Sequence, residues 1–158
     1  GTGRTVVAYE PGRQIADLWF AGDKLIILWN RAFDSAFYPF LPVTRTGIDV
    51  WSPADESVTR TLDIPCARAY PFLRNTFGDG PTLLSPVCPD KTRVFVNDGR
   101  TIALYTIQGR KLDVVYEIKG EIWKCVVKGN RLFLEDRVDA AQDYQPIIPI
   151  PESESVVE

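Results

Sequence analysis

The chain has 158 residues, of which 45% are hydrophobic and 25% charged, and its formal net charge is -3. These values fit one globular domain of ordinary size that can bury a hydrophobic core. Because the net charge gives no basic field and the longest apolar runs are too short to span a bilayer, we expect neither nucleic acid nor a membrane as a partner.

Short segments that alternate between apolar and polar residues follow one another along most of the chain. They are rich in Val, Ile, Thr and aromatic residues, as half-buried β-strands are. No segment shows the apolar stripe of an amphipathic helix. The pattern predicts an all-β domain over residues 1–138, with strands at residues 5–10, 15–21, 25–30, 47–52, 58–64, 82–88, 93–97, 101–107, 112–119, 121–127 and 132–136.

Turns that contain glycine separate several of these strands. Asn97-Asp98-Gly99-Arg100 places an Asp-Gly pair between two strands, and both residues tolerate the positive φ values of a tight hairpin. Similar signals occur at Gln108-Gly109-Arg110, Gly22-Asp23 and Gly129-Asn130. Residues 82–136 are therefore predicted to form an antiparallel meander.

A weak internal repeat also runs through the chain. A turn, a basic residue and an apolar strand occur at residues 22–28 and again at residues 89–96 and 129–134. The last two copies are 40 residues apart, counted from Asp90 to Asn130. This spacing is the period of a four-stranded propeller blade.

The repeat resembles a known family. Residues 47–53 followed by 58–62 resemble the last two strands of a WD40-type blade, and residues 85–96 resemble a WD40 or YVTN-type hairpin. The Gly-His pair of WD40 repeats is absent because the chain has no histidine, and Trp51 precedes serine instead of aspartate. The resemblance covers about residues 15–136 and implies antiparallel four-stranded blades of a partial or open β-propeller.

The resemblance accounts for two full blades, at residues 15–64 and 82–119, and half of a third at residues 121–136. A closed propeller has at least about four blades. We therefore expect a larger protein or self-association to complete the β architecture. A β-sandwich or barrel is the alternative fold.

Two long connections, at residues 31–45 and 65–81, are rich in aromatic residues and proline. Loops of this length in compact domains are usually functional or disordered, and aromatic side chains argue against disorder. Since successive strands run antiparallel, both loops should leave the same face of the domain. A lid over the sheet ends is one interpretation, and a protein-binding surface is the other. The residues of that surface would be Phe33, Phe37, Tyr38, Phe40, Tyr70, Phe72 and Phe77.

The four tryptophans lie within predicted strands, where packing between sheets is the simplest interpretation. A stacking platform is the alternative, and it would make the chain a carbohydrate- or other ligand-binding β-sandwich module. The tryptophans are Trp19, Trp29, Trp51 and Trp123.

The sequence gives few signs of catalysis. Without histidine, the commonest general base and metal ligand is missing, and no CxxC, P-loop or GxGxxG motif is present. Cys66, Cys88 and Cys125 have no paired spacing, so we expect buried thiols in a reducing, intracellular compartment. We expect a non-catalytic interaction or scaffold module with no cofactor and no metal.

Residues 139–158 differ in composition from the rest of the chain. They contain five acidic residues and no basic one, and Pro146, Pro149 and Pro151 interrupt a run of isoleucines. Proline at this spacing favours extended chain over helix. The segment is predicted to be an acidic, proline-rich tail. It is either a solvated linker or, at residues 147–150, an edge strand on a partner or on its own sheet.

Overall fold

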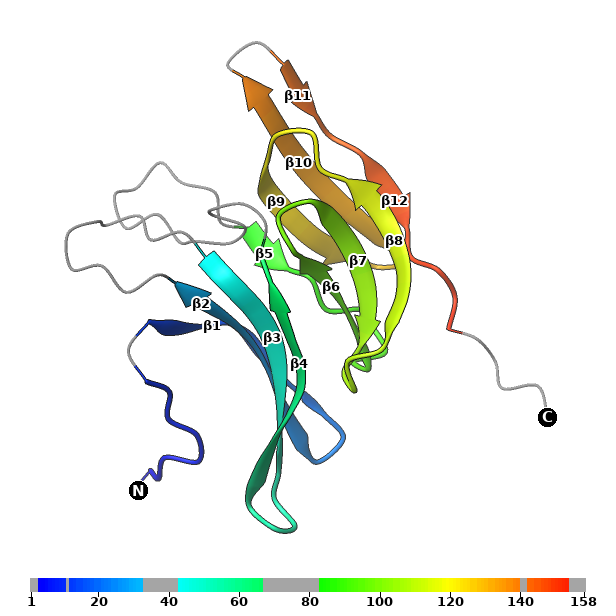
Figure 1. The fold of residues 1–158 in the computed structure, drawn as a ribbon. Coiled ribbons are helices and arrows are strands. Elements are labelled where there is room, and N and C mark those ends of the chain that lie inside the picture. The colour runs from blue at the N-terminus through cyan, green and yellow to red at the C-terminus, as the bar shows by residue number, and fades with distance from the viewer. Residues whose placement is uncertain (1–2, 11, 33–42, 67–82, 140–141, 154–158) are drawn as a thin grey trace.

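The computed structural model describes residues 3–10, 12–32, 43–66, 83–139 and 142–153. These residues form twelve β-strands in three sheets, which confirms the all-β prediction (Figure 1). In this part of the chain no helix is long and apolar enough to cross a membrane. The strands are β1 (Arg13–Ala21), β2 (Lys24–Ala32), β3 (Val43–Ser52), β4 (Ser57–Pro65), β5 (Leu83–Ser85), β6 (Arg93–Asn97), β7 (Thr101–Thr106), β8 (Lys111–Glu117), β9 (Glu121–Lys128), β10 (Arg131–Asp139), β11 (Gln142–Tyr144) and β12 (Ile147–Pro149).

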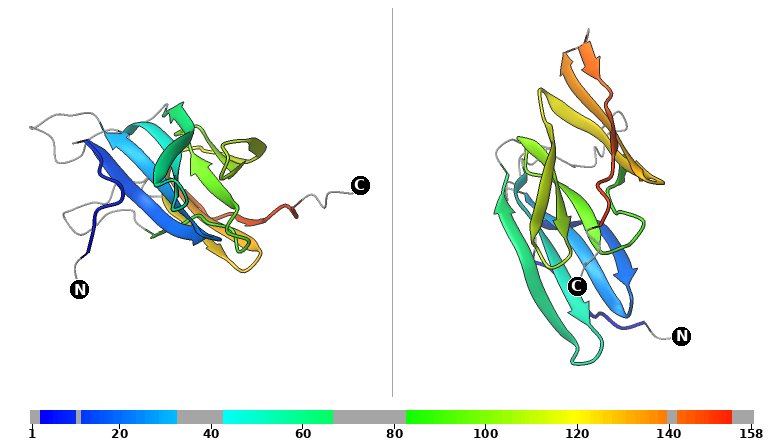
Figure 2. Two further views of the ribbon diagram at one scale, coloured as in Figure 1. Left: turned by 90° about the horizontal axis from the view of Figure 1, so that it is seen from below. Right: turned by 90° about the vertical axis from the view of Figure 1, so that its right-hand side faces the viewer.

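Strands β1 to β4 form an antiparallel meander in chain order, which we call sheet A. Strands β6, β7 and β8 form a three-stranded antiparallel sheet, sheet C. Sheet B has the order β11-β10-β9-β5, and β12 also pairs with β10. Figures 1 and 2 show sheet C between the other two sheets, so the domain is a stack of three layers.

Strands β6 and β7 of sheet C are buried on both faces because the neighbouring sheets cover them from both sides, whereas the edge strand β8 is largely exposed. Val94, Val96 and Ala103 pack against Ile26 and the rest of the inner face of sheet A. On the opposite face of sheet C, Phe95, Ile102 and Leu104 pack against Ile122, Leu132 and Leu134 of sheet B. The five residues of β6 are all buried. A near-continuous apolar run is what a strand covered on both faces needs.

The predicted strand at residues 5–10 is wrong, since no strand forms among residues 3–10. Side chains hold this segment in place. Arg4 forms an ion pair with Glu56 in the β3–β4 turn, and the Tyr9 hydroxyl donates to Asp49 at 2.7 Å. The segment therefore lies against sheet A on the side away from sheet C (Figure 1).

The predicted first strand of the second unit, residues 82–88, is also different. Leu83–Ser85 pairs in parallel with β9 of sheet B, and only Val87 bridges to Val94 of β6. Sheet C therefore has three strands in place of the four expected. The chain crosses from sheet B to sheet C at Pro86, which has no N–H to continue a ladder.

The acidic segment after residue 138 contributes two strands to sheet B. β11 and β12 both pair with β10, and the Ile150 amide donates to the Asn130 carbonyl at 2.8 Å. Ile148 and Ile150 pack against the core between sheets B and C. Of the two interpretations of this segment, an edge strand on the chain's own sheet is the one that the structure confirms for residues 147–149.

Candidate interaction surfaces

The aromatic residues predicted to bind a partner lie outside the described residues: Phe33, Phe37, Tyr38, Phe40, Tyr70, Phe72 and Phe77. The strand ends that flank them are described. Arg31 on β2 pairs with Arg45 on β3, and Arg45 pairs with Pro65 on β4. Three strand ends are thus in register, and the chain leaves β2 and β4 at the same end of sheet A. We call this end the loop end.

The loop end is held together by bonds between neighbouring strands. Arg45 Nε donates to Asp63 Oδ1 at 2.6 Å, and the Cys66 amide donates to the Thr44 carbonyl at 2.9 Å. The ion pair is partly exposed, so it is worth only about 0–1 kcal/mol. The backbone ladder therefore fixes where the two connections begin.

A group of polar residues on the outer face of sheet A surrounds the ring of Trp29. Its indole Nε1 donates to Asp49 Oδ1 at 3.0 Å, and Arg60 donates to both carboxylate oxygens at 2.9 and 3.2 Å. The guanidinium groups of Arg13 and Arg60 lie 4.4 and 4.7 Å from the ring centroid, so both make cation–π contacts with Trp29. With Tyr9 as a third donor group, the carboxylate of Asp49 accepts four hydrogen bonds. The cluster ties the N-terminal segment to the outer face of sheet A, and one of its buried polar atoms, Arg13 Nε, has no hydrogen-bond partner among the described residues.

The other three tryptophans are half-buried, not exposed. Trp19 Nε1 donates to the Lys91 carbonyl at 3.0 Å, and the Arg137 guanidinium lies 3.9 Å from the Trp123 ring centroid. Together with the buried Trp29, they form no exposed row of indole rings. This arrangement disfavours a sugar- or base-stacking platform built from tryptophan.

The outer face of β1 carries a row of exposed apolar side chains. Ile15, Leu18 and Phe20 are 53%, 52% and 64% exposed. A bulge between Ile15 and Asp17 keeps all three on one face, opposite Trp29, Ile27 and Leu25 of β2. Among the residues that the structure describes, β1 is an edge strand and no further strand pairs beside it. We call these three residues the β1 row.

The sequence did not single out the β1 row. Its alternation matches that of any half-buried strand, and nothing local shows whether the second face is covered. The N-terminal segment covers the middle of this face, where β2 and β3 lie, since Tyr9 reaches Asp49. The three side chains of the β1 row stay more than half exposed.

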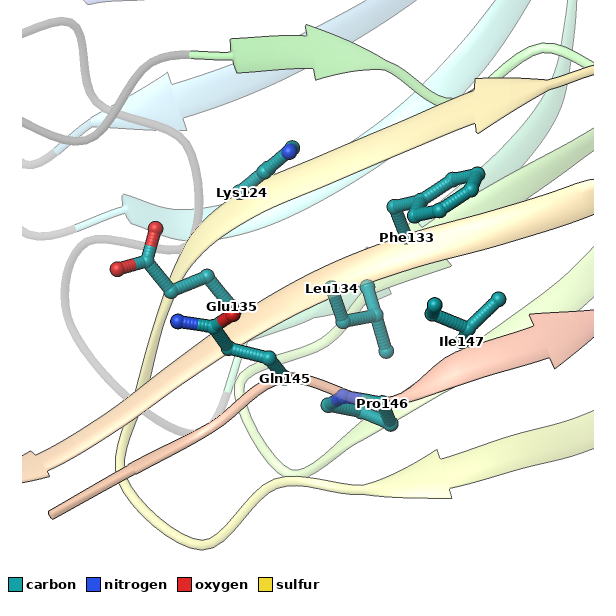
Figure 3. A pocket seen from close by; sticks show the side chains of 7 residues that line it. All are labelled: Lys124, Phe133, Leu134, Glu135, Gln145, Pro146 and Ile147. Atoms are coloured by element: carbon teal, nitrogen blue, oxygen red, sulfur yellow. The ribbon is translucent and has the colours of Figure 1, made fainter.

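A small pocket opens on the outer face of sheet B (Figure 3). It has a volume of about 250 Å³. Its walls come from β9, β10 and the link between β11 and β12: Lys124, Phe133, Leu134, Glu135, Gln145, Pro146 and Ile147. Of these residues, the sequence drew attention only to Pro146 and Ile147, as part of the proline-interrupted run of isoleucines.

The three thiols are free, and Cys88 and Cys125 are buried as expected. Cys66 is only half-buried, so the expectation of a buried thiol is wrong at this position. Burial raises the pKa of Cys125 to about 12 and that of Cys88 to about 11. Burial, then the nearby Asp98 carboxylate, raises the pKa of Cys66 to about 12. Thiols that stay protonated at neutral pH are poor nucleophiles. Among the described residues, no group of three or more Cys, Asp or Glu side chains could hold a metal ion.

No family model matches the chain, and no curated protein or solved structure is significantly similar to it. No family is therefore assigned, and the resemblance to WD40 repeats remains an expectation. Function has to be inferred from the surfaces described above.

Proposed function

We propose that this chain is a non-catalytic protein-interaction module whose partner docks on the loop end and edge strand of sheet A. The β1 row is the main support. Its three apolar side chains are each more than half exposed, whereas the apolar side chains between the sheets are buried. Burying such a side chain contributes about 1.5–3 kcal/mol before entropy costs. Adjacent apolar groups left in water are typical of an interaction site.

The position of the β1 row supports a single surface shared with the two aromatic segments. Ile15 lies two residues from Arg13, which pairs with Arg31 at the loop end. The row therefore starts where the chain enters residues 33–42 and runs along the sheet edge. A partner at the loop end would bury both the row and the aromatic side chains of the segments.

We further propose that the three sheets are blades of an open, propeller-like stack. Neighbouring blades of a propeller pack face to face, as sheet C does with sheets A and B. Sheet A also has the antiparallel four-stranded order of a blade. In such a stack a further sheet, from a longer chain or from a second copy, would pack on the outer face of sheet A along the β1 row. The three free thiols favour an intracellular location for it.

Affinity capture with two double variants tests the interaction proposal. Phe37→Ala/Phe72→Ala changes the aromatic segments, and Leu18→Ser/Phe20→Ser changes the β1 row. The matched control is Val114→Ser, a 42% exposed valine on β8. Thermal melting of each variant checks that the fold is kept.

We expect both double variants to lose the same captured proteins by at least about tenfold, which corresponds to about 1.4 kcal/mol. The control should retain them. Recovery that stays unchanged in both double variants would reject the proposed surface. Loss in only one of them would reject the claim that row and segments form one surface.

A further inference from the structure

The pocket on sheet B exists because the ladder beside β10 is interrupted. β11 ends at Tyr144 and β12 begins at Ile147. Pro146 lies between them and has no N–H to donate, although its carbonyl accepts from the Leu134 amide at 3.1 Å. The gap in the edge strand leaves a hollow over β10, and Figure 3 shows the side chains around it.

The apolar side of the hollow suits one aliphatic side chain. Phe133, Leu134, Pro146 and Ile147 form this side, and Ile147 is 55% exposed. The volume of about 250 Å³ lies below the roughly 300–1,000 Å³ of pockets that enclose whole small molecules. The hollow therefore fits a side chain of a larger partner better than a free cofactor.

Two lysines make the surroundings of the hollow basic. Lys124 and Lys128 lie on β9, with their Nζ atoms 6.0 and 5.9 Å from the Phe133 ring centroid. Arg131 pairs with Lys128 across the hairpin and is exposed. Within the described part of the chain, neither lysine takes part in an ion pair. An acidic partner would supply the missing charge.

The rim of the hollow favours a polypeptide over a nucleic acid. Glu135 lies opposite Lys124 in the register, and its carboxylate accepts from Arg137 Nε at 2.9 Å. A phosphodiester backbone is charged at every nucleotide and would place a charge beside this carboxylate, whereas a peptide can place its uncharged aliphatic residue there. A peptide has N–H donors for Glu135 and for the side-chain carbonyl of Gln145, together with carbonyls for the Gln145 amide.

We propose that this part of sheet B binds a short acidic peptide segment of a partner protein. One aliphatic side chain of the segment enters the hollow against Phe133 and Ile147, and flanking carboxylates face Lys124 and Lys128. The site lies on sheet B, so it is independent of the surface proposed on sheet A. It gives the module a second contact of a different chemical kind.

Titration of the isotope-labelled chain with defined peptides tests the site by NMR. The probes are acetyl-EELEE-amide, acetyl-EESEE-amide, acetyl-KKLKK-amide and decauridylate. We expect only the first to shift the amide signals of Phe133, Leu134 and Ile147 saturably, with an affinity that falls as salt is raised. Lys124→Glu/Lys128→Glu and Ile147→Ser should each weaken binding by about tenfold.

Two matched variants act as controls, since each makes the same change on β8: Lys111→Glu and Val114→Ser. Both should bind as the unchanged chain does. Equal binding of the leucine and serine peptides would overturn the side-chain site. Preferential binding of decauridylate through the same lysines would overturn the peptide assignment in favour of nucleic acid. No binding of any probe at millimolar concentration would overturn the site altogether.

Discussion

Trp29 and Asp49 meet across neighbouring strands, with the indole Nε1 donating to the carboxylate Oδ1 at 3.0 Å. Trp29 is fully buried and Asp49 is 1% exposed. A carboxylate so far from water is stable only when its charge and its lone pairs are matched. Arg60 supplies the charge with two bonds, and Tyr9 supplies a further hydrogen bond from the N-terminal segment.

We expect Asp49→Ala to lower the free energy of unfolding by about 2–4 kcal/mol, mainly because buried hydrogen-bond donors lose their acceptor, since the Arg60 side of the ion pair is 38% exposed. The change leaves the Trp29 N–H and the Tyr9 hydroxyl without their acceptor, and Arg60 without its counter-ion. Urea or guanidinium denaturation measures the effect.

The control for this prediction is Asp63→Ala. Asp63 also pairs with an arginine, Arg45, but both side chains are more than a third exposed. Asp63→Ala should lower the free energy of unfolding by no more than about 1 kcal/mol. Equal costs for the two alanine variants would contradict a stabilising role for the buried carboxylate.

Gly47 lies against the Trp29 ring, and we expect Gly47→Ala to destabilise the fold by about 1–3 kcal/mol through overpacking. A Cβ at this position would overlap with the Leu62 carbonyl oxygen and with the Trp29 ring, closer than van der Waals contact allows. Both are held in the sheet and have no room to move aside. Chemical denaturation of the variant gives the value.

Gly129→Ala separates steric crowding from backbone strain. Gly129 has a φ of 60°, but an added Cβ would meet nothing within 4 Å. Its substitution should cost about 1 kcal/mol, from backbone conformation alone. A Gly47→Ala variant as stable as the unchanged chain would contradict the crowding described here.

Strands and tight turns could be predicted from the sequence because both depend on local chemistry. Gly22, Gly99, Gly109 and Gly129 all have the positive φ that their turns require. The pairing of strands was harder to predict. Residues 83–85 read as part of an antiparallel unit, yet they join β9 in parallel. Local alternation does not specify which strand lies alongside, since that choice depends on contacts distant in sequence.

The surfaces were less predictable than the strands for a similar reason. The exposure of Ile15, Leu18 and Phe20 depends on whether a distant segment covers the outer face of sheet A. The hollow beside Phe133 depends on Pro146 lying opposite β10, which only the pairing of β12 brings about. The aromatic segments were conspicuous in the sequence because composition alone identifies them.

The buried thiols should be unreactive toward a disulfide reagent at pH about 8 in the folded chain, and all should react once it is unfolded. An unfolded thiol has a pKa of about 8.5, whereas burial raises that of Cys125 to about 12. The folded state therefore keeps a proton that the unfolded state loses as the pH rises above about 8.5. The contribution of the protonated Cys125 thiol to the free energy of unfolding is therefore complete below that pH and declines above it.

A Cys125→Ala variant tests the sign of this dependence. Its free energy of unfolding should fall less steeply than that of the unchanged chain as the pH is raised from about 8.5 to 10. Identical slopes would show that the Cys125 thiol is not protected from ionisation. Rapid labelling of Cys88 and Cys125 in the folded chain would contradict their burial.

The C-terminal strand β12 should be required for stability, because one of its faces closes the core between sheets B and C. Ile148 pairs with Leu132 and packs against this core, whereas its neighbour Ile147 points outward and is 55% exposed. Arg93, which is largely buried, also donates to the Pro151 carbonyl at 2.6 Å just beyond the strand. We expect Ile148→Ala to lower the free energy of unfolding by about 1–3 kcal/mol and Ile147→Ala by less than about 0.5 kcal/mol.

Denaturation curves of the two variants test this prediction. Both variants make the same substitution in the same strand, and only the face of the side chain differs. No loss in either variant would mean that β12 is not part of the cooperative fold and that the acidic segment is a linker. Equal losses would contradict the assignment of one inward and one outward face.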